Sequence, residues 1–337
     1  MLGFGGAARR LLELLVAHER RLSDQFGVEF AISAVGTARH GSWLDPAGAP
    51  SAHLLELATG SEWSLPDPRK PGVQLVVESQ AQVLVEATPL EPRGRAAIGH
   101  VEAALDAGLD VVTLNKGPIA WDYGRLAAKA HAAGRALRFE GTVMDGCPVF
   151  SLVEMSLPAA TVSGFAGVLN STSNVVLDRL GAGGELVDAV RHAQDHGFAE
   201  ADPDHDLSGY DTAVKVAILA NVWLGANLDP DDISRPRIDA TVGDAAQAAI
   251  DAGRRLRLLG SASRHDDHVD ASVDLVEVEP TSPFFATADA SSTLQIFTDL
   301  AGVIEVTERT PDLTQTAYGA LADLLHVCAA VVARPNR

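Results

Sequence analysis

Strand-like and helix-like segments alternate through the first 140 residues, and this alternation constrains the fold more than any other feature of the chain. Short runs rich in valine and isoleucine predict strands, and runs with helical spacing separate them. The predicted strands cover 28–36, 73–79, 82–89, 109–118 and 136–143, and the predicted helices cover 7–21, 95–108 and 121–134. Such alternation predicts a parallel, doubly wound α/β sheet of the Rossmann type.

The pattern changes after about residue 140, which indicates a second domain. Helical segments at 186–197 and 210–224 are followed by runs at 270–280 and 293–308 that alternate like antiparallel strands. At 337 residues the chain is also too long for one small core. We therefore expect a nucleotide-binding domain over 1–135, completed by the closing helix in 312–337, and an α+β catalytic and dimerisation domain over 136–311.

Composition excludes several classes of protein. A formal net charge of −19, spread along the chain, disfavours nucleic acid and anionic membranes as partners. No apolar run reaches membrane-spanning length, and the first apolar stretch carries charges that a signal peptide would lack. Two cysteines, Cys147 and Cys328, are too few for a disulfide framework, so we expect a reducing, cytoplasmic location.

A glycine-rich turn opens the chain and resembles a dinucleotide-binding turn. Its G-x-G-x-x-A pattern puts glycine where the chain turns tightly and where backbone approaches a pyrophosphate, at the start of a helix. The predicted cofactor-binding residues here are Gly3, Phe4, Gly5, Gly6 and Ala7. The alternative is a flexible glycine-rich terminus, which the alternation that follows makes less favourable.

Only Met1 and Leu2 precede this turn, so the first strand of the sheet is apparently missing. In a doubly wound sheet that strand is central, and its loss leaves two neighbouring strand edges unpaired. We expect that the true start lies upstream of Met1 and that the chain as written binds its cofactor weakly.

Arg39 bears on the choice of cofactor. An NAD site usually has an acidic residue after the second strand to bind the ribose hydroxyls, whereas here the segment "VGTARHGS" offers Arg39. An arginine can bind the 2′-phosphate of NADP, so the sequence favours NADP over NAD, although NAD stays possible. Arg39 could equally be a solvated loop residue.

An acid-rich segment in the second half precedes a long apolar helix. Asp211 and Lys215 lie four residues apart and so share one helix face. A lysine on a mostly buried helix is partly desolvated, which lowers its pKa toward the range of an acid–base catalyst. The preceding acidic loop, which contains Glu200, Asp202, Asp204 and Asp206, could receive a substrate amino group. The alternative is a surface ion pair that contributes a few tenths of a kcal/mol.

Two further candidates follow predicted strands of the first domain. Lys116 comes directly after "DVVTL", and Thr88 follows "VLVEA". Ligands of open α/β sheets bind at the carboxyl ends of the strands, so both residues are expected at the active site. Hydride transfer to a carbonyl carbon also needs a proton donor for the carbonyl oxygen, and an ammonium group can supply that proton.

With these motifs in place, the chain resembles homoserine dehydrogenase over nearly its whole length. The motifs that carry the resemblance are "LGFGGAARRLLEL", "VEATPLEPRGRAAIGHVEAALDAGLDVVTLNKGPIA", "FEGTVMDGCPV", "GVLNSTSN", "GFAEADPDHDLSGYDTAVKVAILA" and "TAYGALADLL". The resemblance is to the short form of the family, without a C-terminal ACT domain. It implies NADP-dependent interconversion of L-homoserine and L-aspartate 4-semialdehyde in threonine and methionine biosynthesis, by a homodimer.

The resemblance also implies roles for individual residues. Lys215 corresponds to the catalytic proton donor and Asp211 to its partner. Glu200, with Asp206, is implied in substrate binding, Lys116 at the junction of cofactor and substrate, and Thr88 in cofactor binding. A structural sodium ion is implied at Glu140, Val143, Asp145 and Cys147, most of them through carbonyl oxygens, which suit a hard ion.

Three departures from the family pattern keep other functions open: the missing first strand, "NSTSN" where a glycine and threonines are usual, and "ERTPDLTQTA" in place of a glycine-rich loop. One alternative is a non-catalytic homologue with a truncated cofactor domain. Another is a dehydrogenase of a related amino-acid semialdehyde.

Overall fold

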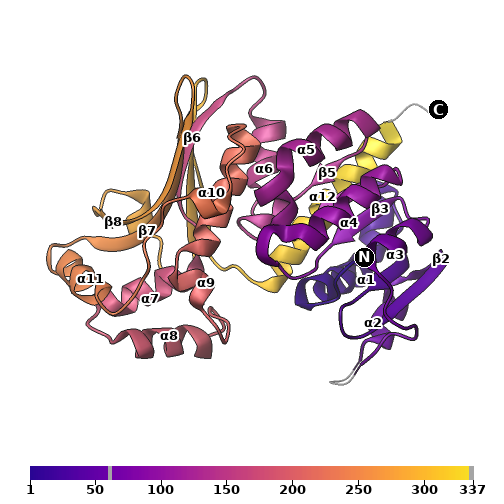
Figure 1. Ribbon diagram of the computed structural model, residues 1–337, viewed down its shortest axis with the longest axis horizontal. Helices are drawn as coiled ribbons and strands as arrows, with labels where there is room; N and C mark the ends of the chain where they lie inside the picture. The colour runs from indigo at the N-terminus through magenta and orange to yellow at the C-terminus, as the bar shows by residue number, and fades with distance from the viewer. Residues whose placement is uncertain (60–62, 334–337) are drawn as a thin grey trace. The chain divides into compact units, whose positions relative to one another are not determined.

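The computed structural model describes residues 1–59 and 63–333 and divides into two compact units (Figure 1). The first unit comprises Met1–Ser151 and the segment from Asp312 onward, and the second comprises Leu152–Pro311. The first unit thus extends to Ser151, whereas the sequence prediction ended it at 135.

The first unit is built on a parallel sheet in the order β3-β4-β5 and an antiparallel pair, β1-β2. Its helices pack around these strands, as the sequence pattern predicts for the fold class. The elements are α1 (Gly6–Phe26), β1 (Ala31–Gly36), β2 (Ser42–Pro50), α2 (Ser51–Leu57), α3 (Gly72–Glu78), β3 (Val83–Glu86), η1 (Pro92–Gly94), α4 (Arg95–Asp106), β4 (Asp110–Thr113), α5 (Gly117–Ala133), β5 (Leu137–Arg138), η2 (Glu140–Thr142), α6 (Val149–Ser151) and α12 (Leu313–Ala333).

One residue, Leu2, stands where a central strand is expected. It forms parallel bridges to Gly36 at the end of β1 and to Glu86 at the end of β3. Its N–H donates to the carbonyl of Val85 at 2.9 Å, and its carbonyl accepts from the N–H of Ala87 at 2.7 Å. The first strand is therefore reduced to its last residues, which join the two sets of strands.

A cavity of about 590 Å³ continues the line of this shortened strand. Residues 31–34 border it on the β1 side and residues 82–85 on the β3 side, with Leu11 of α1 and Leu324 of α12 among its apolar lining. The amino group of Met1 lies at its end and donates to the carbonyl of Ala34 at 2.8 Å. The cavity therefore lies between the two sets of strands that Leu2 joins.

One sequence prediction for this unit is wrong. Residues 73–79 form most of the helix α3 rather than a strand, because neighbouring Leu75 and Val76 are buried while Val73 and Val77 are exposed, which is a helical pattern. The segment 45–50 contains two prolines and belongs to β2, which pairs only with β1 among the named strands. Such an edge strand tolerates proline.

The closing helix α12 completes the hydrophobic core of the first unit. Its residues Ala317, Ala320 and Leu321 pack in one cluster with Leu11 and Leu12 of α1. Figure 1 shows α12, in yellow, beside the indigo α1. The apolar face that the sequence gives this helix therefore packs on the first unit.

The second unit is a five-stranded antiparallel sheet, in the order β10-β9-β6-β7-β8, covered by helices. The helix α10, predicted at 210–224, is buried from Thr212 to Val214 and from Val216 to Asn221. The elements are η3 (Leu152–Ser156), β6 (Val162–Val168), α7 (Ser171–Gly181), α8 (Leu186–Asp195), α9 (Asp204–Leu207), α10 (Tyr210–Trp223), η4 (Pro230–Asp232), α11 (Val242–Asp251), β7 (Arg255–Arg264), β8 (Val269–Val278), η5 (Pro283–Phe285), β9 (Ser292–Thr298) and β10 (Gly302–Glu308).

Candidate active site

The opening turn has the geometry of a phosphate-binding turn. Gly3 has a φ of +83°, and a Cβ there would lie 2.2 Å from the carbonyl oxygen of Ala87, so only glycine fits. A Cβ on Gly5 would meet no protein atom within 4 Å, and α1 begins at the next residue, Gly6. Backbone N–H groups at Gly6 and Ala7 lie in the first turn of the helix, where a helix binds anions.

Phe4 holds this turn from the core side. Its side chain is 4% exposed and packs edge to face on Trp63, with ring centroids 5.6 Å apart. The guanidinium of Arg9 lies 4.9 Å from the centroid of the Trp63 ring. Any contact of Phe4 with a cofactor therefore comes from its backbone.

Arg39 is exposed in the loop that follows β1. The Thr37 hydroxyl fixes this loop, because it accepts from the N–H of His40 and donates to the carbonyl of Gly41, both at 2.8 Å. The ring of His40 stacks on Trp63 with centroids 4.1 Å apart. The loop is thus ordered by local hydrogen bonds while the Arg39 side chain faces solvent.

Thr88 and Lys116 lie at the carboxyl ends of the neighbouring strands β3 and β4, and Asn115 links the two ends. The Asn115 amide donates to the carbonyl of Thr88 at 2.9 Å, and its oxygen accepts from the N–H of Gly117 at 2.8 Å. Lys116 is the N-cap residue of α5. The first unit therefore brings the predicted cofactor residues Thr88 and Lys116 to one edge of its sheet, as expected for an α/β ligand site.

The sequence analysis missed Glu86, a fully buried carboxylate at the end of β3. Its Oε1 accepts from the Thr88 hydroxyl at 2.5 Å and from the Thr88 N–H at 3.3 Å, and it lies 3.4 Å from Nδ1 of His100. The sequence did indicate this residue, because an acidic side chain inside an apolar strand is rarely buried unless it has a partner. Here it orients Thr88.

In the second unit, Lys215 and Asp211 form a mostly buried ion pair. Lys215 Nζ lies 3.1 Å from Asp211 Oδ2, and the two side chains are 14% and 16% exposed. The ammonium also donates to the carbonyl of Leu169 at 2.6 Å. An ammonium has three N–H groups, so one remains for a substrate atom.

Asn170 joins this pair to a second carboxylate. Its amide nitrogen donates to Asp206 Oδ1 at 2.8 Å and to Asp211 Oδ2 at 2.9 Å. Burial, and secondarily the charge of Asp211, raise the pKa of Asp206 above its ordinary value of 3.8. Asn170 lies in the segment that departs from the family pattern and was not among the predicted site residues, although it links α7, α9 and α10.

Glu200 is exposed in the loop before α9. Its carbonyl accepts from the side chain of Gln194 at 3.1 Å, and the carbonyl of Phe198, two residues earlier, accepts from the hydroxyl of Thr172 in α7. The loop is thus held to two helices while the Glu200 carboxylate stays free to meet solvent. Its substrate-binding role stays a prediction.

Glu140 and Cys147, two of the four predicted sodium ligands, have hydrogen-bond partners within the protein. Glu140 is 4% exposed, and its two oxygens accept from the N–H groups of Phe150 and Ser151 at 2.8 and 2.9 Å. The carbonyl of Cys147 accepts from the N–H of Val149 at 2.8 Å. These contacts add no support for sodium at Glu140, Val143, Asp145 and Cys147, and the ion stays a prediction.

Comparison with known proteins identifies the family. The sequence model of homoserine dehydrogenase matches residues 148–325, and that of the homoserine dehydrogenase NAD-binding domain matches residues 3–140. The chain belongs to the homoserine dehydrogenase family. It is an NAD(P)-dependent oxidoreductase that acts on a CH–OH group.

Similar proteins cover nearly the whole chain. An NAD(+)-dependent homoserine dehydrogenase of Pseudomonas canavaninivorans is 33% identical over 333 residues, covering 97% of this chain and 95% of its own. A homoserine dehydrogenase of Methanocaldococcus jannaschii is 29% identical and covers 97% of both chains. The solved structure of a putative homoserine dehydrogenase of Archaeoglobus fulgidus has a TM-score of 0.86 at 27% identity, over 97% of both chains.

The family confirms the sequence-based recognition and fold class. The search for membrane spans, made over the residues that the structure describes, finds no helix long and apolar enough to cross a bilayer.

Proposed function

We propose that the chain interconverts L-homoserine and L-aspartate 4-semialdehyde, with Lys215 as the residue that exchanges the proton. The observation that carries this assignment is the mostly buried Lys215–Asp211 pair, held by Asn170 beside Asp206. A lysine with one N–H free and a fixed carboxylate partner has the geometry of an acid–base catalyst.

The turn at Gly3 and Gly5, with Thr88 at the end of β3, would hold a nicotinamide cofactor, which would supply the hydride chemistry. The residues of the chain handle the proton. In the oxidation of homoserine, the hydroxyl proton passes to neutral Lys215 Nζ, which becomes an ammonium; in the reduction, the ammonium returns it to the carbonyl oxygen. Asp211 stabilises the charged form of Lys215.

Two carboxylates of the second unit, Asp206 and Glu200, supply the recognition of the amino acid in this proposal. Asp206 is held by Asn170, and Glu200 lies exposed in the loop before α9. Both can accept charge-assisted hydrogen bonds from the α-ammonium of homoserine. An uncharged alcohol of the same length therefore binds more weakly.

Substitution of Lys215 tests the assignment. We expect Lys215→Ala to lower kcat by at least about 100-fold, the lower range for loss of a general acid–base catalyst, with cofactor affinity nearly unchanged. The assay follows reduced nicotinamide by absorbance, with cofactor binding measured separately. Lys129→Ala, a surface lysine paired with Asp106, is the matched control. Near-normal turnover by Lys215→Ala would remove Lys215 from its role.

The second part of the proposal concerns the cofactor. Arg39, exposed in the loop after β1, supports NADP, whereas the Pseudomonas relative is named as NAD(+)-dependent. We propose a preference for NADP carried by Arg39, so Arg39→Ala should raise the KM for NADP about 10-fold and leave that for NAD unchanged, corresponding to one lost charge-assisted contact. Equal effects on both cofactors would contradict a 2′-phosphate contact.

A homodimer in a reducing, cytoplasmic compartment belongs to the same proposal. Exposed Leu300 and Val303 at the β9–β10 hairpin support an interface on the second unit, and a sequence with only two cysteines supports the compartment. Light scattering measures the oligomeric state.

Two other functions are outcomes of the same assays. Folded protein without turnover of any substrate would support a non-catalytic homologue. A dehydrogenase of a related semialdehyde would instead turn over a homologous amino alcohol faster than L-homoserine.

A further inference from the structure

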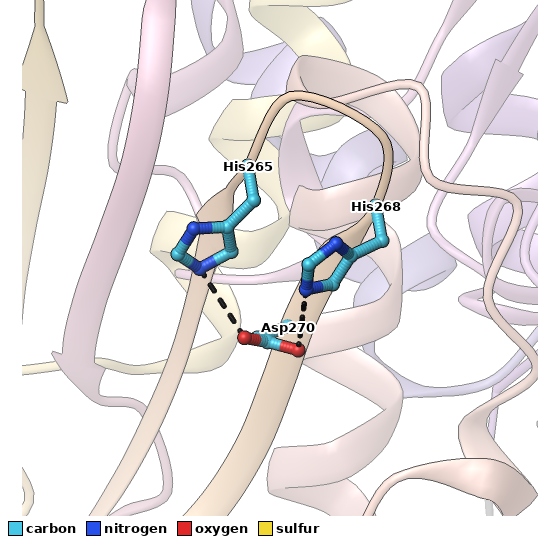
Figure 2. Close-up of side chains that lie close together, drawn as sticks. All are labelled: His265, His268 and Asp270. Atoms are coloured by element: carbon cyan, nitrogen blue, oxygen red, sulfur yellow. Dashed lines mark ion pairs between the residues drawn. The ribbon is translucent and has the colours of Figure 1, made fainter.

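The tip of the β7–β8 hairpin gathers two imidazoles and a carboxylate on one side. His265 and His268 flank a two-residue turn, and Asp270 follows on β8 (Figure 2). One potential ligand atom from each residue lies within 4.8 Å of the other two. We propose that this group binds a divalent transition-metal ion, Zn²⁺, at a site separate from the residues assigned to the dehydrogenase reaction.

The distances suit a metal with little rearrangement. His265 Nε2 lies 3.2 Å from Asp270 Oδ2, and His268 Nε2 lies 3.4 Å from Asp270 Oδ1. Ligands about 2.1 Å from a tetrahedral Zn²⁺ stand roughly 3.4 Å apart. Closing the two imidazoles toward each other needs only side-chain rotation, because both rings are half exposed.

A second contact prepares His268 for this role. Its Nδ1 lies 2.7 Å from Asp267 Oδ1, so with the proton on Nδ1 the ring donates to a carboxylate and presents Nε2 as the lone-pair nitrogen. Ligating histidines commonly carry such an outer carboxylate, which fixes the ring and raises its basicity. Asp267 is thus a positioning residue.

The β7–β8 hairpin that holds the three proposed ligands is hydrogen-bonded along its length. The N–H of His265 donates to the carbonyl of His268 at 2.8 Å, which closes the turn. Below it, β7 and β8 pair in unbroken register from Arg264–Val269 to Arg255–Val278. Two nitrogens and one oxygen suit Zn²⁺ better than Mg²⁺ or Ca²⁺, which prefer oxygen ligands.

Titration of the metal-free chain with ZnCl₂ by calorimetry, in a buffer that does not bind zinc, tests the site. We expect one equivalent of micromolar affinity in the wild type, and its loss in the double variant His265→Ala/His268→Ala. The matched control is His192→Ala/His196→Ala, which removes another surface histidine pair with ring centroids 4.1 Å apart. This control should keep the equivalent.

A third variant tests the outer carboxylate. Asp267→Asn should weaken zinc binding about 10-fold and keep the stoichiometry. Circular dichroism without zinc checks that the variants fold, and His265→Gln/His268→Gln replaces the alanine pair if it does not. Identical titrations of the wild type and the His265/His268 variant would overturn the site, as would loss of the equivalent in the His192/His196 variant; the group would then be an ordinary set of surface ion pairs.

Discussion

At the scale of single residues, Asp206 combines a cost to stability with a role in the site. Burial and the neighbouring charge of Asp211 raise its pKa, so the folded chain resists its ionisation. Above the ordinary pKa of 3.8 the unfolded chain loses this proton more readily, and the free energy of unfolding falls as the pH rises through the raised pKa. At neutral pH the ionised carboxylate is therefore destabilising.

The variant Asp206→Asn tests this directly. It keeps an oxygen that can accept from Asn170 and removes the buried charge. We expect the melting temperature at pH 7 to rise by a few degrees, a gain that disappears toward pH 4, while the KM for homoserine increases. Thermal melts from pH 4 to 8 give the first result and initial rates the second. A stability gain of the same size at pH 4 and at pH 7 would contradict the raised pKa.

At the scale of elements, Asn170 performs two tasks that can be separated. Its Oδ1 caps α7 by accepting from the N–H of Ser173 at 2.8 Å, while its amide nitrogen bridges Asp206 and Asp211. Asn170→Ser keeps a cap and loses the bridge, whereas Asn170→Ala loses both. We expect both variants to lower kcat about 10-fold. The free energy of unfolding of the alanine variant should in addition be about 1 kcal/mol lower than that of the serine variant. Urea unfolding and steady-state kinetics measure the two effects, and a fully active serine variant would show that the bridge is dispensable.

The elements also show how far the sequence alone reaches. The helix at α10 was predictable because its apolar residues surround it, and the strands β3 and β4 because they are short apolar runs before polar residues. The segment 73–79 was not predictable from its β-branched residues, since packing of Leu75 and Val76 decides its structure.

Contacts between side chains that lie far apart in the sequence were equally unpredictable. Lys215 and Asp211 are a local pair that helical spacing reveals. Asn170 and Asp206 lie 36 residues apart, and the Asn115–Thr88 contact spans 27, so only the folded chain shows which side chains they orient. Glu86 was difficult to assign for another reason. The sequence around a single carboxylate in an apolar strand does not reveal which side chains that carboxylate contacts.

At the scale of the whole molecule, a chain that starts at Met1 has a buried terminal amino group, and this group makes its stability depend on pH. Burial lowers its pKa from 8.0 to about 5, against the opposing charge of Glu86. Between these values the unfolded chain binds a proton that the folded chain does not, so the free energy of unfolding rises as the pH increases from 5 to 8, by a few kcal/mol. The raised pKa of Asp206 acts in the opposite direction, so the Met1 contribution is best isolated by changing Met1 itself.

Two N-terminal extensions make that change. Four β-branched apolar residues joined to Met1 would convert its amine to an amide, which still donates to Ala34, and would extend into the cavity between residues 31–34 and 82–85. A matched four-residue extension of glycine, serine and proline removes the amine without filling the cavity. Both should abolish the Met1 contribution to the pH dependence, and the apolar one alone should raise the free energy of unfolding, on the order of several kcal/mol. Because Leu2 lines this cavity and directly precedes Gly3 of the cofactor turn, the apolar extension should also tighten cofactor binding and increase homoserine oxidation. Equal stability of the two extended chains would mean that a longer central strand does not stabilise the sheet. Equal activity of the two extended chains and the chain without an extension would show that the cofactor turn needs no further support from this strand.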